Sequence, residues 1–196
     1  PDRAHALLHE MEELYESTQN KQLQPNCISY STVIHAYAQS SSSQEHDHDT
    51  DKARHAYQIF QGMRAKGVQP NTVTYNNLLN CFATSKAPQP ELIDMVGKLY
   101  QQVLTEDMPD HYTFGTVLKA CCNLLWKDAG FAPAVFREAC ERGHVSSGVL
   151  WQLRQAVPVD TYRERVGEND QITWSELPGK WTRNVRDDRS TRTRRK

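Results

Sequence analysis

The sequence predicts an all-α protein, specifically an α-solenoid of helix–turn–helix repeats. A string that opens on Pro followed by Asn or Asp occurs three times, and apolar residues return after it at helical spacing. A second amphipathic segment follows each copy. The three strings are QPNCISYSTVI from Gln24, QPNTVTYNNLL from Gln69 and MPDHYTFGTVL from Met108.

Every segment of the repeat carries an apolar stripe at positions i, i+3, i+4 and i+7, as a helix with one buried face does. The first-segment stripes are Tyr30, Val33, Ile34 and Tyr37; Tyr75, Leu78, Leu79 and Phe82; and Phe114, Val117, Leu118 and Cys121. The second-segment stripes are Ala56, Ile59, Phe60 and Met63; Val96, Leu99, Tyr100 and Val103; and Ala132, Val135, Phe136 and Ala139, which Gly143 closes. An unpaired second segment with Ala4, Leu7, Leu8 and Met11 precedes them, and each pair is expected to pack on the next.

These patterns divide the chain into six parts. Residues 1–24 are the second helix of an incomplete upstream repeat, 25–69 are repeat one with a polar insertion at 40–51, 70–108 are repeat two, 109–146 are a degenerate repeat three, 147–182 are a C-terminal capping segment, and 183–196 are an Arg-rich disordered tail. Trp151, Trp174 and Trp181 are expected to cover the last repeat, an interpretation favoured over base stacking. Because the chain begins at Pro1 and its first helix lacks a partner, we expect a piece of a longer array.

Composition argues against several classes of function. The five cysteines form no Cys-x-x-Cys pair and are expected to be reduced and mostly buried. We find no phosphate-binding Gly-rich loop, no nucleophile–base signature and no metal-binding carboxylate cluster, so we expect no enzyme and no cofactor. No apolar run is long enough to span a bilayer, so no membrane partner is expected. Outside the tail, whose charge is +5, the chain carries −6, a poor balance for binding nucleic acid through phosphates alone.

The string MRAKGVQ followed by Pro-Asn-x-x-Thr-Tyr-Asn-x-Leu-Leu resembles the pentatricopeptide repeat (PPR) family, and the resemblance runs from Ala4 to about Ser147. Tetratricopeptide arrays also pair helices, but their Trp-Leu-Gly-Tyr pattern is not visible here. The resemblance implies that the chain binds single-stranded RNA, with a few side chains of each repeat selecting one base.

Two positions of each repeat select the base in this family: the residue after the Tyr or Phe of the first helix, and the residue after the Pro that ends the unit. The resemblance implies an adenine-preferring pair, Ser31 with Asn71, and a uracil-preferring pair, Asn76 with Asp110. Asn26 would be the partner of the missing upstream helix. The family's base-packing position corresponds to Ile28, Val73 and Tyr112.

Each of these residues has a simpler interpretation. Asn26, Asn71 and Asp110 could cap helices, and both roles can coexist. Ser31 and Asn76 could be ordinary exposed helix residues. His5 and His9 share a helix face and could bind zinc, but no third ligand follows, so solvated surface is favoured for them. His46 and His48 could bind a divalent ion weakly, but a disordered polar insertion is favoured there.

Two features depart from the family pattern. Gly115 stands where repeat three needs a base-selecting side chain, and GHVSS has lost the closing Pro. The positions at which members of the family often carry a phosphate-binding Lys are Gln39, Thr84 and Asn123. The resemblance implies a non-catalytic adaptor in RNA processing, stability or translation within an organelle, mitochondrion or plastid. The alternative is a protein-binding scaffold that has lost contact with RNA.

Overall fold

The computed structural model describes residues 1–40, 47–84, 90–124, 130–167 and 174–185, which form helices and connecting turns without a strand. The helices are α1 (Asp2–Thr18), α2 (Cys27–Gln39), α3 (Asp47–Ala65), α4 (Thr72–Ala83), α5 (Pro90–Thr105), α6 (His111–Leu124), α7 (Phe131–Arg142), α8 (Ser147–Ala156), α9 (Val159–Val166) and α10 (Gly179–Thr182). Two 3-10 turns, η1 (Lys21–Leu23) and η2 (Trp174–Glu176), complete the order.

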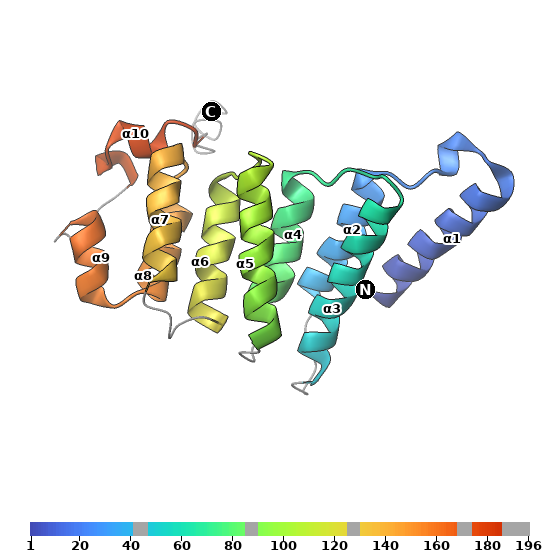
Figure 1. Ribbon diagram of the computed structural model, residues 1–196, viewed down its shortest axis with the longest axis horizontal. Helices are drawn as coiled ribbons and strands as arrows, with labels where there is room; N and C mark the ends of the chain where they lie inside the picture. Colours follow the sequence, from blue (N-terminus) through green and yellow to red (C-terminus); the bar gives the residue numbers. More distant parts are fainter. Residues whose placement is uncertain (41–46, 85–89, 125–129, 168–173, 186–196) are drawn as a thin grey trace, which may run out of the picture.

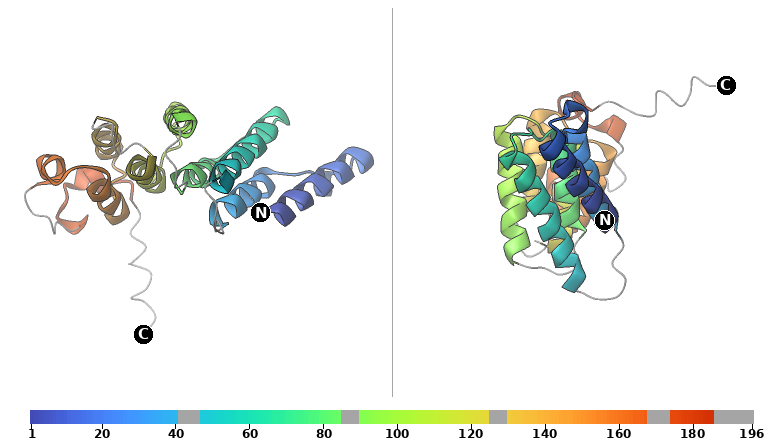
Figure 2. Two further views of the ribbon diagram at one scale, coloured as in Figure 1. Left: turned by 90° about the horizontal axis from the view of Figure 1, so that it is seen from below. Right: turned by 90° about the vertical axis from the view of Figure 1, so that its right-hand side faces the viewer.

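The helices form two rows, which confirms the predicted solenoid (Figure 1, Figure 2). The first-helix row consists of α2, α4, α6 and α8, and its consecutive members pack directly on one another. The second-helix row consists of α1, α3, α5 and α7, whose members mainly contact the first helices beside them. Because α8 packs on α6 as α6 packs on α4, the row of first helices continues into the segment predicted as a cap.

Local sequence signals explain where the helices begin and end. Asn26, Asn71 and Asp110 each accept hydrogen bonds from backbone N–H groups in the first turn of α2, α4 and α6, so the capping interpretation is correct for all three. At the other end, Gly67 closes α3 and Gly143 closes α7, with φ values of 75° and 74°. Glycine adopts this left-handed conformation without the steric cost that a Cβ would impose.

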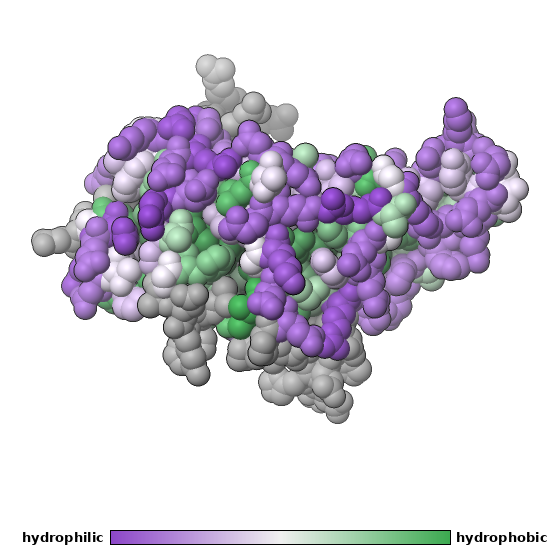
Figure 3. Space-filling model, viewed as in Figure 1, coloured by the Kyte–Doolittle hydropathy of each residue, from purple (hydrophilic) through white to green (hydrophobic). Residues whose placement is uncertain are grey.

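The predicted stripes form the core. All twelve residues of the three first-segment stripes and all twelve of the three second-segment stripes are buried. In α1 only Leu8 is buried and Leu7 is exposed, because α1 packs mainly against α2. The face formed by the second-helix row is hydrophilic over α1 and α3 and shows hydrophobic surface towards its middle (Figure 3).

A recurring phenol–carboxylate bond ties second helices to first helices. Tyr30 donates to Glu12 at 2.6 Å, and Tyr75 donates to Glu106 at 2.9 Å. Burial, and then the carboxylate itself, raises the pKa of both phenols, so each remains a protonated donor. In the third copy the residue is Phe114, which buries an apolar ring without this bond.

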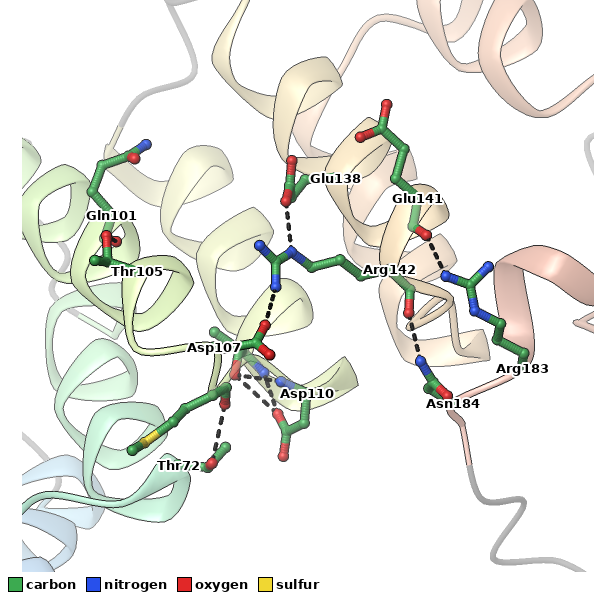
Figure 4. A network of polar contacts seen from close by, with 12 residues as sticks. Thr72, Gln101, Thr105, Asp107, Asp110, Glu138, Glu141, Arg142, Arg183 and Asn184 are labelled. Carbon is green, nitrogen blue, oxygen red and sulfur yellow. Dashed lines mark hydrogen bonds and ion pairs between the residues drawn. The ribbon is translucent and has the colours of Figure 1, made fainter.

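The segment after α8 covers the end of α7. Trp181 packs edge-on against Phe136, with ring centroids 5.8 Å apart, and the indole N–H of Trp174 donates to the carbonyl of Val145 at 3.0 Å. Figure 4 shows Arg183 and Asn184 bonded to the last carbonyls of α7. Trp174 and Trp181 therefore act as predicted, whereas the expectation for Trp151 is wrong, because its side chain is exposed.

Several predicted features lie partly outside the described residues. The second half of the polar insertion, from Asp47, belongs to α3, while residues 41–46 and the tail from 186 are not described. None of the five cysteines forms a disulfide, and burial raises the pKa of Cys81 to about 12. Across the described ranges, no helix has both the length and the hydropathy that crossing a bilayer requires.

We expect Gly143→Ala to destabilise the protein by at least about 1 kcal/mol, because alanine disfavours the left-handed backbone. Its Cβ would also lie 2.5 Å from Cγ of Arg183 and 3.1 Å from the Lys180 carbonyl. Denaturant titration measures the loss. The control is Gly62→Ala in α3, which has no described atom within 4 Å of its Cβ and should gain up to about 1 kcal/mol. Equal stability of Gly143→Ala and wild type would contradict the closure of α7 described here.

Candidate functional site

The contact between α2 and α4 places Ser31 and Asn71 around one buried hydroxyl. Ser31 Oγ lies 2.7 Å from Oγ1 of Thr74, and the Thr74 hydroxyl donates to Oδ1 of Asn71 at 3.0 Å. The backbone N–H of Thr74 donates to the same Oδ1 at 2.9 Å. We call this arrangement junction one; Thr74 joins the two predicted residues into a single polar cluster.

The contact between α4 and α6 repeats the arrangement with different side chains. Asn76 donates through Nδ2 to Oδ1 of Asp110 at 3.0 Å, and its Oδ1 accepts from the Thr113 hydroxyl at 2.7 Å. The backbone N–H of Thr113 donates to Oδ1 of Asp110 at 2.8 Å. This is junction two, and here the predicted pair is in direct contact.

Sequence reasoning missed the two threonines at the centre of these junctions. Thr74 and Thr113 are fully buried, and both stand three residues after the cap residue. That spacing is the capping-box pattern, and it could have pointed to both threonines from the sequence. The pattern alone does not show that the hydroxyl also contacts the preceding first helix. Ser29 occupies the equivalent place beside Asn26 in α2.

The contact between α6 and α8 has lost this polarity and is called junction three. Gly115 occupies the place of Ser31 and Asn76, and Val149 occupies the place of the threonines. A Cβ built on Gly115 would meet one described atom within 4 Å, Cγ2 of Val149 at 4.0 Å. Ser146 caps α8 by accepting from the N–H of Val149 at 3.2 Å.

The predicted base-packing residues form an exposed line across the first-helix row. Ile28, Val73 and Tyr112 each occupy the second position of their helix, and their side chains are 73%, 58% and 61% exposed. The Tyr112 ring contacts the His111 ring, with centroids 4.2 Å apart. Exposed apolar side chains at the same position of three successive helices are candidates for contact with a ligand or partner.

One turn further along the first helices, a second set of polar contacts crosses the same interfaces. Asn77 of α4 donates to the carbonyl of Ser31 at 3.2 Å, and Lys119 of α6 donates to Asn80 at 3.1 Å. At the late positions where the family often has Lys, Asn123 donates to the carbonyl of Ala83. These side chains hold first helices together.

His5 and His9 do not assemble a metal site in the structure's described part. His5 Nδ1 lies 3.0 Å from the Tyr37 hydroxyl, and His9 lies 3.5 Å from Glu13, so the first pair has separate partners. His46 lies outside the described residues and the side chain of His48 is not described. Among described residues, no three His, Cys, Asp or Glu side chains lie close enough to hold a metal ion.

Positive charge gathers at the C-terminal end of the array. A hollow of about 450 Å³ between α7, α9 and α10 is lined by four cations with one carboxylate, namely Arg137, Arg165, Lys180 and Arg183 with Glu141. Residues 1–130, by contrast, hold ten Lys and Arg against fifteen Asp and Glu. The two polar junctions therefore lie in the acidic part of the chain.

A family model of the pentatricopeptide repeat domain matches residues 7–84. Its span covers α2, α3, α4 and junction one. Residues 7–84 therefore belong to the pentatricopeptide repeat family.

The PPR fold also appears in a comparison with solved structures. The chain is similar to the PPR domain of Arabidopsis thaliana protein-only RNase P 1, crystallised in complex with tRNA, with a TM-score of 0.54 and 18% sequence identity. The match covers 83% of this chain and 80% of that domain. No curated protein matches the chain.

We expect Thr113→Val to destabilise the protein by about 1–3 kcal/mol, because the half-buried side-chain oxygen of Asn76 and the backbone N–H of Asp110 lose the buried hydroxyl that pairs with them. Thermal and denaturant unfolding measure the change. The matched control is Thr32→Val in α2, whose exposed hydroxyl bonds only the Ile28 carbonyl of its own helix. That variant should stay within about 0.5 kcal/mol of wild type. A similar loss in both variants would show that junction two has no special role.

Proposed function

We propose that the protein binds single-stranded RNA along its first-helix row, with junction one selecting adenine and junction two selecting uracil. The observation that carries the proposal is the recurrence of a polar cluster at two successive helix contacts. Each cluster holds its side chains in place and leaves hydrogen-bonding groups unused. A line of exposed apolar side chains runs beside both clusters.

The donor and acceptor roles of the hydrogen bonds at junction one favour adenine. The Thr74 hydroxyl donates to Asn71, so Ser31 must donate its own proton to Thr74 and keeps only lone pairs for a base. The Asn71 oxygen accepts from Thr74, which leaves its amide N–H groups as donors. Adenine presents an amino donor beside a ring-nitrogen acceptor. Serine is also short, which leaves room for a purine.

Junction two favours a smaller base. Asn76 uses one N–H on Asp110 and one lone pair on Thr113, so one donor and one acceptor site remain. Uracil offers an N–H beside carbonyl oxygens and can pair with both. The hydrogen bond to Asp110 fixes the orientation of the Asn76 amide, and with it the positions of the remaining N–H donor and oxygen acceptor. Because asparagine reaches further than serine, it leaves less room for a purine.

Ile28, Val73 and Tyr112 supply the base-packing surface of the proposal. Stacking on an aromatic ring contributes about 1–3 kcal/mol per base, and only Tyr112 offers such a ring. The two aliphatic residues provide apolar contact to base faces. We therefore assign the larger share of base-packing affinity to Tyr112.

We further propose that the protein acts without catalysis, as an adaptor on an organellar transcript. Support for RNA as the partner comes from the PPR family and from the similar domain crystallised with tRNA. The organelle rests on the family resemblance alone. A protein-binding role has its own support, because the late first-helix positions carry Gln39, Thr84 and Asn123 in place of a phosphate-binding cation.

Selection of bound RNA by the full chain tests the proposal, with Asn76→Ser as the decisive variant. Serine would leave space for a purine, and the Asp110 carboxylate would then accept from the N–H groups of guanine. We expect the selected base at one position to change from uracil to guanine, with a preference of about 10-fold, while the adenine position is unchanged.

The control for this substitution is Asn80→Ser, on the same helix one turn later. The Asn80 side chain accepts a hydrogen bond from Lys119 and is not part of either polar junction. It should leave the selected sequence as in wild type. If Asn76→Ser selected the same RNA sequence as wild type, the assignment of uracil to junction two would be wrong. A wild-type chain that selects no RNA would remove the RNA proposal and favour a protein partner.

A further inference from the structure

The cationic hollow at the C-terminal end of the array lies outside the first-helix row. Its lining residues belong to α7, to α9 and to the segment of α10 that runs from Lys180 to Arg183. Figure 1 shows these helices at the opposite end of the array from α1, with α10 above α7. The volume of about 450 Å³ is within the range of about 300–1,000 Å³ that is typical of ligand pockets. The hollow is therefore a possible binding site separate from junctions one and two.

Most of the positive charge at this hollow is not neutralised by the protein itself. Three lining cations, here called the unpaired cations, have no hydrogen-bond or ion-pair partner in the described part of the chain, namely Arg137, Arg165 and Lys180. By contrast, Arg54 of α3 pairs with Glu91 at 2.7 Å, and Arg142 of α7 pairs with Asp107 at 2.7 Å. Cations that share a hollow without a carboxylate partner concentrate anions there.

The fourth cation is held in place over the end of α7. The Arg183 guanidinium donates to the carbonyl of Glu141 at 2.6 Å, as Figure 4 shows, and to the carbonyl of Lys180 at 3.1 Å. Both acceptors are neutral backbone oxygens, so the charge of Arg183 is not cancelled. The Glu141 side chain provides the one carboxylate among the lining residues. The hollow therefore suits a ligand that carries more than one negative charge.

An apolar wall stands beside these cations. Pro133 and Phe136 are buried, and Phe136 packs edge-on against Trp181. Burial raises the pKa of the Cys140 thiol to about 12, so this side chain is neutral. The indole N–H of Trp181 has no acceptor among the described residues, whereas that of Trp174 is already bonded. The wall can thus contact a planar apolar group and donate one hydrogen bond to it.

We propose that this hollow binds a nucleotide, with the phosphates among the unpaired cations and the base against Trp181. Arginine forms paired hydrogen bonds with phosphate oxygens, and lysine provides a compact charge. The Glu141 carboxylate can accept from a hydroxyl of the ribose or an N–H of the base. An acidic peptide fits less well, because its charges are spread along the chain, whereas a nucleoside diphosphate carries them on adjacent phosphate groups. This inference does not depend on the proposed RNA binding.

The test measures binding of ADP to the full chain by isothermal titration calorimetry at low salt, where screening of exposed charges is weakest. We expect one ADP to bind per chain. Adenosine and inorganic pyrophosphate should each bind at least about 10-fold more weakly, because each makes only part of the contacts. A hexa-aspartate peptide should not displace ADP. Absence of ADP binding would overturn the inference, and tighter binding of the peptide than of ADP would replace the nucleotide by an acidic protein partner.

Substitution of two unpaired cations tests their role. Arg137→Gln combined with Arg165→Gln changes exposed side chains, so the fold should be retained. We expect the affinity for ADP to fall at least about 10-fold, because charge-assisted hydrogen bonds to phosphate are lost. The matched control, Arg3→Gln combined with Lys98→Gln, removes the same charge from exposed positions on α1 and α5 and should stay within about 2-fold of wild type. Equal weakening in both double variants would show a net-charge effect and contradict the site.

A competition experiment separates this site from the proposed RNA binding. Saturating ADP should leave the dissociation constant of the selected RNA unchanged, because the lining residues of the hollow lie outside the first-helix row. If ADP displaced the RNA, the hollow would be part of the RNA-binding surface and the separate site would be wrong. A chain that binds ADP but selects no RNA would remove the proposed function and support the nucleotide site.

Discussion

The direct packing of each first helix on the next is the interaction on which this structure depends. At junctions one and two the contact is made around the hydroxyl of Thr74 or Thr113, which also completes the capping box of its own helix. The same atom therefore determines where a helix begins and where its neighbour lies. Side chains such as Ser31 and Asn76 are held by this shared bond, so the polar groups repeat in register along the row.

The helical stripes of the three complete repeats were predictable from the sequence, because the spacing of apolar residues identifies which face of a helix is buried. All the stripes of the three complete repeats are buried as expected. The candidate site was predictable only as pairs of positions, and it required the family resemblance. Periodicity assigns a residue to a face, but it does not give the offset between two helices. For that reason the role of Thr113, the exposure of Trp151 and the place of α8 in the first-helix row emerged only from the structure.

The low identity to a similar PPR domain has a simple physical explanation. A stripe needs apolar residues of suitable volume, and many combinations of Leu, Val, Ile, Phe and Tyr satisfy it. A helix start needs a short polar cap and a hydroxyl three residues later, as at Asn71 with Thr74. Neither requirement restricts the exposed residues beside the junctions. Two chains can therefore share this architecture at 18% identity while presenting different surfaces along the row.

The unequal contacts of the two rows have a mechanical consequence. First helices touch one another along the whole series, whereas second helices mainly touch the first helices beside them. A bending load on the array is therefore borne on one side by continuous side-chain packing and on the other mainly by surface ion pairs such as Arg54 with Glu91. The solenoid is therefore stiffer along the first-helix row than along the second-helix row. It can change its pitch while the distance between neighbouring junctions stays nearly constant.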